Sequence, residues 1–204
     1  MLHSGFGVKA HAEQQCRAGH LRSEFEDAGV PWRTAADRTE HLRRTIVEVT
    51  DRIAALDLRR PPLLVGGNSD GVLRIAAEHA DIVGFTGLIR ARGGGLRPVD
   101  ARTMDERVAF VRAARGGSDH ESTILIQDVT VTDDPMAAAA AWAERVPDVD
   151  VAELPSAPSF LFGTVDGIAK ELHVRRDRYG FSYVTVFEQV MEPFAEVIAT
   201  LSRP

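Results

Sequence analysis

The sequence predicts an α/β fold in which helices cover a parallel sheet. Short apolar runs alternate with segments whose apolar residues recur every three or four positions, which is the mark of strands alternating with helices. The runs are almost uniformly apolar, as in strands buried on both faces. The alternation occurs four times. Four such units amount to half a barrel or a small open sheet.

Length and composition fit one globular domain. The chain has 204 residues, of which 44% are hydrophobic and 26% charged. We therefore expect a single domain over residues 1–204, with residues 1–16 unassigned. The net charge of -6 argues against a nucleic-acid surface. No apolar stretch approaches the roughly 20 residues of a membrane span, and no signal peptide is visible. Cys16 has no second cysteine with which to form a disulfide. We therefore expect a cytoplasmic protein.

The chain before the first predicted strand contains two predicted helices. A short polar helix over residues 20–28 is ended by Gly29. A longer amphipathic helix begins at Asp37, the predicted N-cap, with Glu40 three residues later. Its apolar stripe consists of Leu42, Ile46, Val49, Ile53 and Leu56.

Strands and helices then alternate to the end of the chain. The predicted strands are residues 63–65, 82–85, 124–131 and 181–187. Helices are predicted after each of them, and an additional turn follows the second strand. Three of these helices have a recognisable N-terminal signal: a capping box at residues 103–106, Pro135 in a first helical position, and the N-cap Thr164. Gly180 is predicted to end the helix that Thr164 begins.

The turn between the first of these strands and its helix, residues 66–71, is the predicted binding site. Gly66 and Gly67 let backbone N–H groups approach an anion, and the following helix adds its positive end, so a phosphate could be held without lysine. The alternative is an ordinary glycine-rich turn with Ser69 or Asp70 as N-cap. Asn68 occupies the second-glycine position of a dinucleotide fingerprint, and no Walker A lysine follows.

The same turn also matches the pattern G-x-S-x-G of a nucleophile elbow, with Ser69 as the nucleophile. A serine hydrolase would need an acid and a histidine later in the chain. Asp128 and His173 are in suitable order, but they fall inside a predicted strand and a predicted helix. The scattered histidines lack metal-binding spacing, so no metal site is predicted.

A second turn, Thr86–Gly87, ends the next strand and could add a hydroxyl and an amide to the same anion site. Beyond it, Arg90, Arg92 and Arg97 flank three glycines. Such arginines could clamp a polyanionic ligand, because guanidinium groups bind carboxylate and phosphate bidentately. The alternative is a solvated flexible loop.

Several segments together resemble one enzyme family. PPLLVGG (residues 61–67) and VLRIAAEHADIVG (residues 72–84) resemble the fifth to sixth strands of the luciferase-like monooxygenases, especially their coenzyme F420-dependent oxidoreductase branch. Residues 163–166 and 179–184 resemble the family's last helix and eighth strand, and residues 18–25 the end of its fourth strand. The resemblance covers residues 17–204.

This resemblance implies a TIM barrel that binds F420, or alternatively FMN. Gly66, Gly67, Asn68, Thr86 and Gly87 would lie at the cofactor phosphate, with Arg90 beside them. It also places His20 near the reactive ring, in proton transfer or substrate orientation.

The family's first three strands have no counterpart here, so the resemblance implies an incomplete barrel with about four clear parallel strands. Exposed strand edges then predict a homodimer. The predicted function is an oxidoreductase acting on a small organic substrate, without nucleic-acid or membrane partners. The alternatives are a catalytically silent relative that binds a phosphorylated ligand or a partner chain, and the serine hydrolase.

Overall fold

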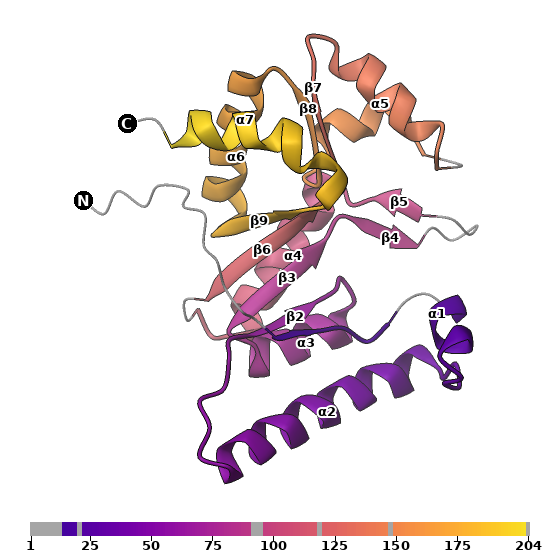
Figure 1. The fold of residues 1–204 in the computed structure, drawn as a ribbon, viewed down its shortest axis with the longest axis vertical. Helices are drawn as coiled ribbons and strands as arrows, with labels where there is room; N and C mark the ends of the chain where they lie inside the picture. Colours follow the sequence, from indigo (N-terminus) through magenta and orange to yellow (C-terminus); the bar gives the residue numbers. More distant parts are fainter. Residues whose placement is uncertain (1–13, 20–21, 91–95, 118–119, 147–148, 203–204) are drawn as a thin grey trace. The chain divides into compact units, whose positions relative to one another are not determined.

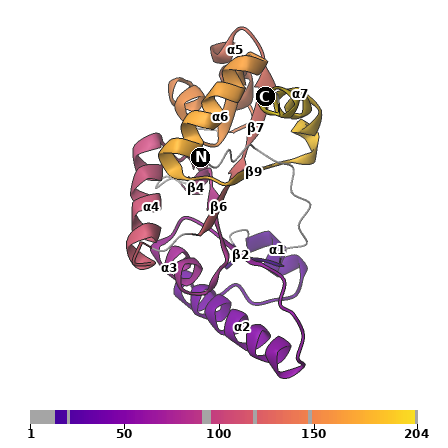
Figure 2. The same cartoon turned by 90° about the vertical axis from the view of Figure 1, so that its left-hand side faces the viewer.

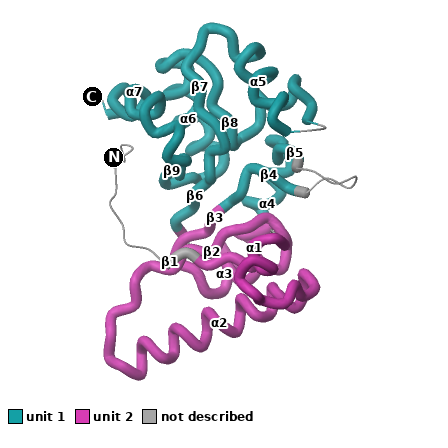
Figure 3. The backbone as a smooth tube through the Cα atoms, turned by 45° about the vertical axis from the view of Figure 1, so that its right-hand side comes forward, with its two compact units in different colours: residues 1–10, 85–109, 121–204 teal, residues 11–84, 110–120 magenta. Residues whose placement is uncertain are grey.

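A computed structural model describes residues 14–19, 22–90, 96–117, 120–146 and 149–202. It confirms the α/β class with parallel strands and covering helices (Figure 1). The chain folds as two compact units, shown in different colours in Figure 3. Residues 11–84 and 110–120 form one, called here the α2 unit; residues 1–10, 85–109 and 121–204 form the other, the α6 unit. Each unit has its own strands and helices.

The α2 unit contains three neighbouring parallel strands. They are β1 (Gln14–Cys16), β2 (Leu63–Gly66) and the first residues of β3 (Ile82–Thr86), in the order β1-β2-β3. Val65 is opposite Cys16 on one side and Val83 on the other. All four residues of β2 are buried, as its uniform apolar sequence predicted. Because the strands are parallel, the carboxyl ends of β1 and β2 meet at one edge.

Helices α1 (Arg22–Asp27), α2 (Ala35–Ala55) and α3 (Asp70–His79) complete this unit. Helix α3 packs on β2, and α2 packs on α3 (Figures 1 and 2). Thr34 caps α2: its Oγ1 accepts a bond from the Asp37 N–H at 3.1 Å. The predicted N-cap at Asp37 is therefore three residues too late. Leu56, predicted to face inward, is 69% exposed because the helix ends before it.

The α6 unit contains three strand pairs. Parallel pairs join β6 (Glu121–Ile126) to β9 (Tyr183–Val186) and β7 (Asp128–Val131) to β8 (Phe160–Gly163). Strands β4 (Leu88–Arg90) and β5 (Leu96–Pro98) form an antiparallel pair. The run predicted as one strand over residues 124–131 is two, because the Gln127 N–H bonds to the Ser159 carbonyl at 2.7 Å. Strand β8 and the β4–β5 pair were not predicted.

The helices of the α6 unit largely start and stop where the sequence predicted. They are α4 (Ala101–Ala114, its last residues in the α2 unit), α5 (Pro135–Ala143), α6 (Val165–Tyr179) and α7 (Met191–Leu201), with 3-10 turns η1 (Val151–Ser156) and η2 (Glu188–Val190). Thr164 caps α6, and Gly180 ends it at φ 77°. For α4, the Asp100 carboxylate accepts a bond from the Thr103 N–H at 2.6 Å, so the helix begins before the predicted box. Helices α6 and α7 pack side by side (Figure 2).

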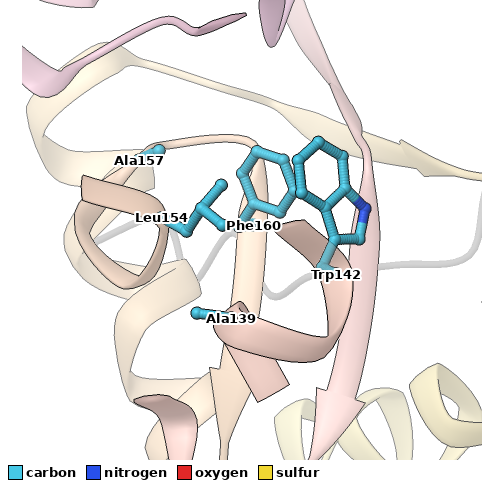
Figure 4. Packing of buried hydrophobic residues seen from close by; sticks show 5 residues of the cluster. All are labelled: Ala139, Trp142, Leu154, Ala157 and Phe160. Carbon is cyan, nitrogen blue, oxygen red and sulfur yellow. The ribbon is translucent and has the colours of Figure 1, made fainter. Parts of the chain in front are cut away.

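An aromatic cluster anchors α5 in the α6 unit (Figure 4). The Trp142 ring meets the Phe160 ring edge to face, with 4.6 Å between the ring centroids. Ala139, Leu154 and Ala157 complete the cluster. The alanines explain the apolar run of α5, because small side chains let this helix approach η1 closely. Within the described residues, no helix is both long and apolar enough for a membrane crossing.

Candidate functional site

The turn after β2 leads directly into α3. Ser69 is the N-cap of this helix, and its Oγ accepts a hydrogen bond from the Val72 N–H at 3.4 Å. The positive end of the α3 dipole therefore lies immediately beyond the carboxyl end of β2. This is the strand–turn–helix context predicted for residues 66–71, and it gives Ser69 the capping role of the simpler interpretation.

Gly67 is required by packing. Its N–H donates to the Gly84 carbonyl at 2.9 Å, so this amide is used by the sheet. A Cβ at this position would lie 2.7 Å from Cγ1 of Val72, which is closer than real carbon contacts allow. Gly67 thus allows α3 to close onto β2, and the N–H group expected to face an anion is engaged by Gly84.

Gly66 differs from Gly67 because a Cβ there would make only ordinary van der Waals contacts. Gly66 pairs with Gly84 of the neighbouring strand. A Cβ on Gly66 would meet no atom closer than 3.6 Å, and the nearest side-chain nitrogen is Nε of Arg17 at 3.8 Å. Gly66 and Gly84 are both buried, so what this edge offers to an anionic group is the Arg17 guanidinium at the carboxyl end of β2.

Arg17 is the functional candidate that sequence analysis missed. It directly follows β1, whose carboxyl end lies at the same edge as that of β2. The strand itself, Gln-Gln-Cys, has no apolar run and gave no signal. Arg17 is exposed and forms no ion pair with any of the described residues, so its positive charge is available to a ligand.

Gly87, in the α6 unit, is also dictated by packing. A Cβ there would lie 1.9 Å from Cβ of Ser159, which is completely buried. Ser159 Oγ donates to the Gly87 carbonyl at 3.2 Å, and the Val99 N–H donates to the same oxygen at 2.9 Å. The Thr86–Gly87 turn is therefore held firmly, and its role at the cofactor phosphate stays a prediction.

Three of the predicted residues have no described side chain. His20 and Arg92 lie outside the described residues. Arg90 ends β4, but only its backbone is described. Arg97 lies on β5 and is exposed. The paired strands β4 and β5 flank the three glycines of the predicted loop. The clamp by Arg90, Arg92 and Arg97 stays a prediction.

The residues considered for a serine hydrolase have structural partners instead. Ser69 caps α3. The Asp128 carboxylate accepts a bond from the Val129 N–H at 3.0 Å and faces Arg145 at 3.4 Å. His173 lies exposed on α6. Nothing in this geometry orients Asp128 toward a histidine.

The α2 unit also carries the chain's cysteine at this edge. Cys16 is the last residue of β1, and burial raises the pKa of its thiol. Among the residues described, no three His, Cys, Asp or Glu side chains gather where they could hold a metal ion.

No protein-family model and no curated protein sequence matches the chain. One solved structure, an F420-dependent secondary alcohol dehydrogenase in complex with an F420–acetone adduct, superposes with a TM-score of 0.68 at 12% identity over 92% of this chain and 67% of the dehydrogenase. The fold is of the TIM-barrel type. At this identity the similarity establishes the fold alone.

Two monooxygenases also superpose on part of the chain. Long-chain alkane monooxygenase (LadA) is 16% identical, and EDTA monooxygenase (EmoA) from Chelativorans sp. BNC1 is 14% identical, each with a TM-score of 0.45 over 70% of this chain. The chain spans 41% of the first and 44% of the second. It thus covers about two thirds of the dehydrogenase and less than half of either monooxygenase.

Proposed function

We propose that the chain is an oxidoreductase of the luciferase-like type, which transfers hydride between coenzyme F420 and a small organic substrate. FMN is the alternative cofactor. Two findings support the proposal: the TIM-barrel fold shared with an F420-dependent dehydrogenase, and the resemblance of residues 61–84 to the family's fifth and sixth strands. Because the chain spans about two thirds of that dehydrogenase, the activity of the whole enzyme is part of the proposal.

The Arg17 guanidinium beside Gly66, next to the start of α3, carries this proposal. Gly66 has no side chain, and Nε of Arg17 lies 3.8 Å from the position that a Cβ would take there. The positive end of α3 and the Arg17 guanidinium both favour a negative charge here. Each charge-assisted hydrogen bond contributes about 1.5–3 kcal/mol.

In this proposal Gly66, Gly67 and Asn68 form the turn at the phosphate. Gly67 contributes by letting α3 close onto β2, since its N–H is engaged by the Gly84 carbonyl. When bound, the cofactor supplies the hydride chemistry, while the protein supplies position and electrostatics. His20 is proposed to hold or move a proton at the substrate oxygen. For Thr86, Gly87 and Arg90 of the α6 unit, contact with the cofactor stays a prediction.

The test is a fluorescence titration of the purified protein with F420 and, separately, with FMN. We expect saturable binding of F420 and at least about tenfold weaker binding by Arg17→Met, since 1.4 kcal/mol corresponds to tenfold. Gly66→Val, which adds a branched side chain beside Arg17, is expected to weaken binding similarly. Arg52→Met is the matched control, because Arg52 is an exposed arginine of α2 paired with Glu48.

Failure of both cofactors to bind would refute the proposal. Binding of F420 without hydride exchange with any secondary alcohol or ketone would instead support the catalytically silent relative that binds a phosphorylated ligand. If Arg17→Met and Gly66→Val bind F420 as tightly as the unmodified protein, the phosphate lies elsewhere.

A further inference from the structure

The α2 unit contains a pocket that shares Arg17 with the proposed cofactor site and is otherwise lined by other residues. It has a volume of about 810 Å³, within the size range of small-molecule sites. Its walls come from the end of β1, from α1, from the segment that follows α1, and from the first half of α2. Phe25, Val30 and Leu42 provide apolar wall, and Arg17, Arg33 and Arg38 provide positive charge.

The apolar wall is held in place by its own packing. The Phe25 ring meets the Trp32 ring edge to face, with centroids 5.0 Å apart. On its other side, a Cβ on Gly19 would lie 2.5 Å from the Phe25 ring, so the chain approaches the ring closely there. Gly19 adopts φ 75°, a conformation that favours glycine. This wall is therefore present before any ligand binds.

The charges around the pocket leave an excess of arginine. Four arginines and two carboxylates line it. Glu40 accepts bonds from Arg43 at 2.6 and 2.9 Å, and this pairing holds the pKa of its carboxyl below the usual value. Asp37 accepts the Thr34 hydroxyl at 2.7 Å. Both carboxylates thus have partners near the start of α2, whereas Arg17 and Arg33 form no ion pair within the described parts of the chain.

Arg38 adds a guanidinium group of fixed orientation. Its guanidinium carbon lies 3.7 Å from the centre of the Trp32 ring, and its Nη1 donates to the Arg33 carbonyl. Its Nε is buried without a hydrogen-bond partner among the described residues. Three guanidinium groups thus face one space that also has an apolar wall.

We propose that this pocket binds a small organic carboxylate with an apolar body. The carboxylate would bond to Arg17, Arg33 and Arg38, and the body would lie against Phe25, Val30 and Leu42. The guanidinium groups suit any oxyanion, but the apolar wall favours an organic one over free phosphate. This inference goes beyond the proposed function, because Arg33 and Arg38 take no part in the cofactor turn.

Calorimetric titration of the whole chain tests this inference with three probes: 4-phenylbutyrate, its uncharged analogue 4-phenylbutanamide, and inorganic phosphate. We expect saturable binding of 4-phenylbutyrate, at least about tenfold tighter than that of either other probe. Arg33→Met is expected to weaken this binding at least about tenfold, because an exposed charge-assisted bond is lost. Arg52→Met, on the same helix as Arg38 but outside the pocket, should leave it unchanged.

A second variant keeps the test decisive. Val30 is 48% exposed, so Val30→Glu should fold normally, yet it places a carboxylate on the apolar wall and should abolish binding. Four results would each overturn the inference. The first two are that the amide or inorganic phosphate binds as tightly as 4-phenylbutyrate. The others are that 4-phenylbutyrate does not bind at millimolar concentrations, or that Arg33→Met binds it as tightly as the unmodified chain. Arg33→Met should bind F420 as tightly as the unmodified chain, and loss of F420 binding in this variant would also overturn the inference. An unmodified chain that binds 4-phenylbutyrate but not F420 would contradict the proposed function alone.

Discussion

Gly87 offers a direct test of the packing that holds the end of β3. Alanine at this position would place its Cβ 1.9 Å from Cβ and 2.0 Å from Oγ of Ser159. Ser159 is fully buried and cannot swing into solvent. We therefore expect Gly87→Ala to destabilise the protein through overpacking, and Ser159→Gly to relieve the clash.

The size of the effect follows from the contacts. Overpacking of a buried site costs typically about 1–3 kcal/mol, and a separation of only 1.9 Å from a side chain fixed by its own hydrogen bond belongs near the upper limit. Ser159→Gly alone removes one hydrogen bond, worth about 1 kcal/mol. The double variant should be about 2 kcal/mol more stable than the sum of the two single changes predicts.

Urea unfolding followed by circular dichroism measures these free energies. In thermal unfolding, a loss of about 3 kcal/mol corresponds to a fall in Tm of about 6–12 °C for a chain of this length. Gly66→Ala is the matched control: its new Cβ would meet nothing closer than 3.6 Å, and we expect a change below about 1 kcal/mol.

Two results would refute this reasoning. One is a Gly87→Ala protein as stable as the unmodified one. The other is a double variant no more stable than Gly87→Ala alone, because the clash with Ser159 would then not be the cause.

Four further predictions concern pH, reactivity and assembly. The hydrogen bond from the Thr103 N–H lowers the pKa of Asp100, so the carboxylate stabilises the fold fully above about pH 4 and less as the pH falls through the lowered pKa. Asp100→Ala should therefore lower the free energy of urea unfolding by about 1 kcal/mol at neutral pH. A loss of the same size in strong acid would contradict this prediction. Because burial raises the pKa of Cys16, its alkylation by iodoacetamide at pH 8 should be slower than that of a free cysteine, and equal rates would disprove it. The homodimer should appear as twice the chain mass in light scattering coupled to size exclusion, and a stable monomer would exclude it. The single domain predicted over residues 1–204 should unfold in one calorimetric transition, whereas two transitions would separate the two units.

Much of the secondary structure could be predicted because its causes are local. The uniform apolar run of β2 and the caps Thr164 and Gly180 act within a few residues of themselves. Strand β1 has no such signal, since Gln-Gln-Cys joins the sheet through its backbone. The division of residues 124–131 into two strands also lay beyond prediction, because it depends on the distant carbonyl of Ser159.

The sequence by itself determined the α/β class, four parallel strands and the turn at residues 66–71, because periodicity and caps are properties of neighbouring residues. Only the tertiary structure decided what the glycines do: Gly67 and Gly87 make room for Val72 and Ser159, while a Cβ on Gly66 would make only ordinary van der Waals contacts. It also brought Arg17 to Gly66 and gathered arginines from separate segments around one pocket. Such proximity arises from the packing of distant segments, which no local pattern records.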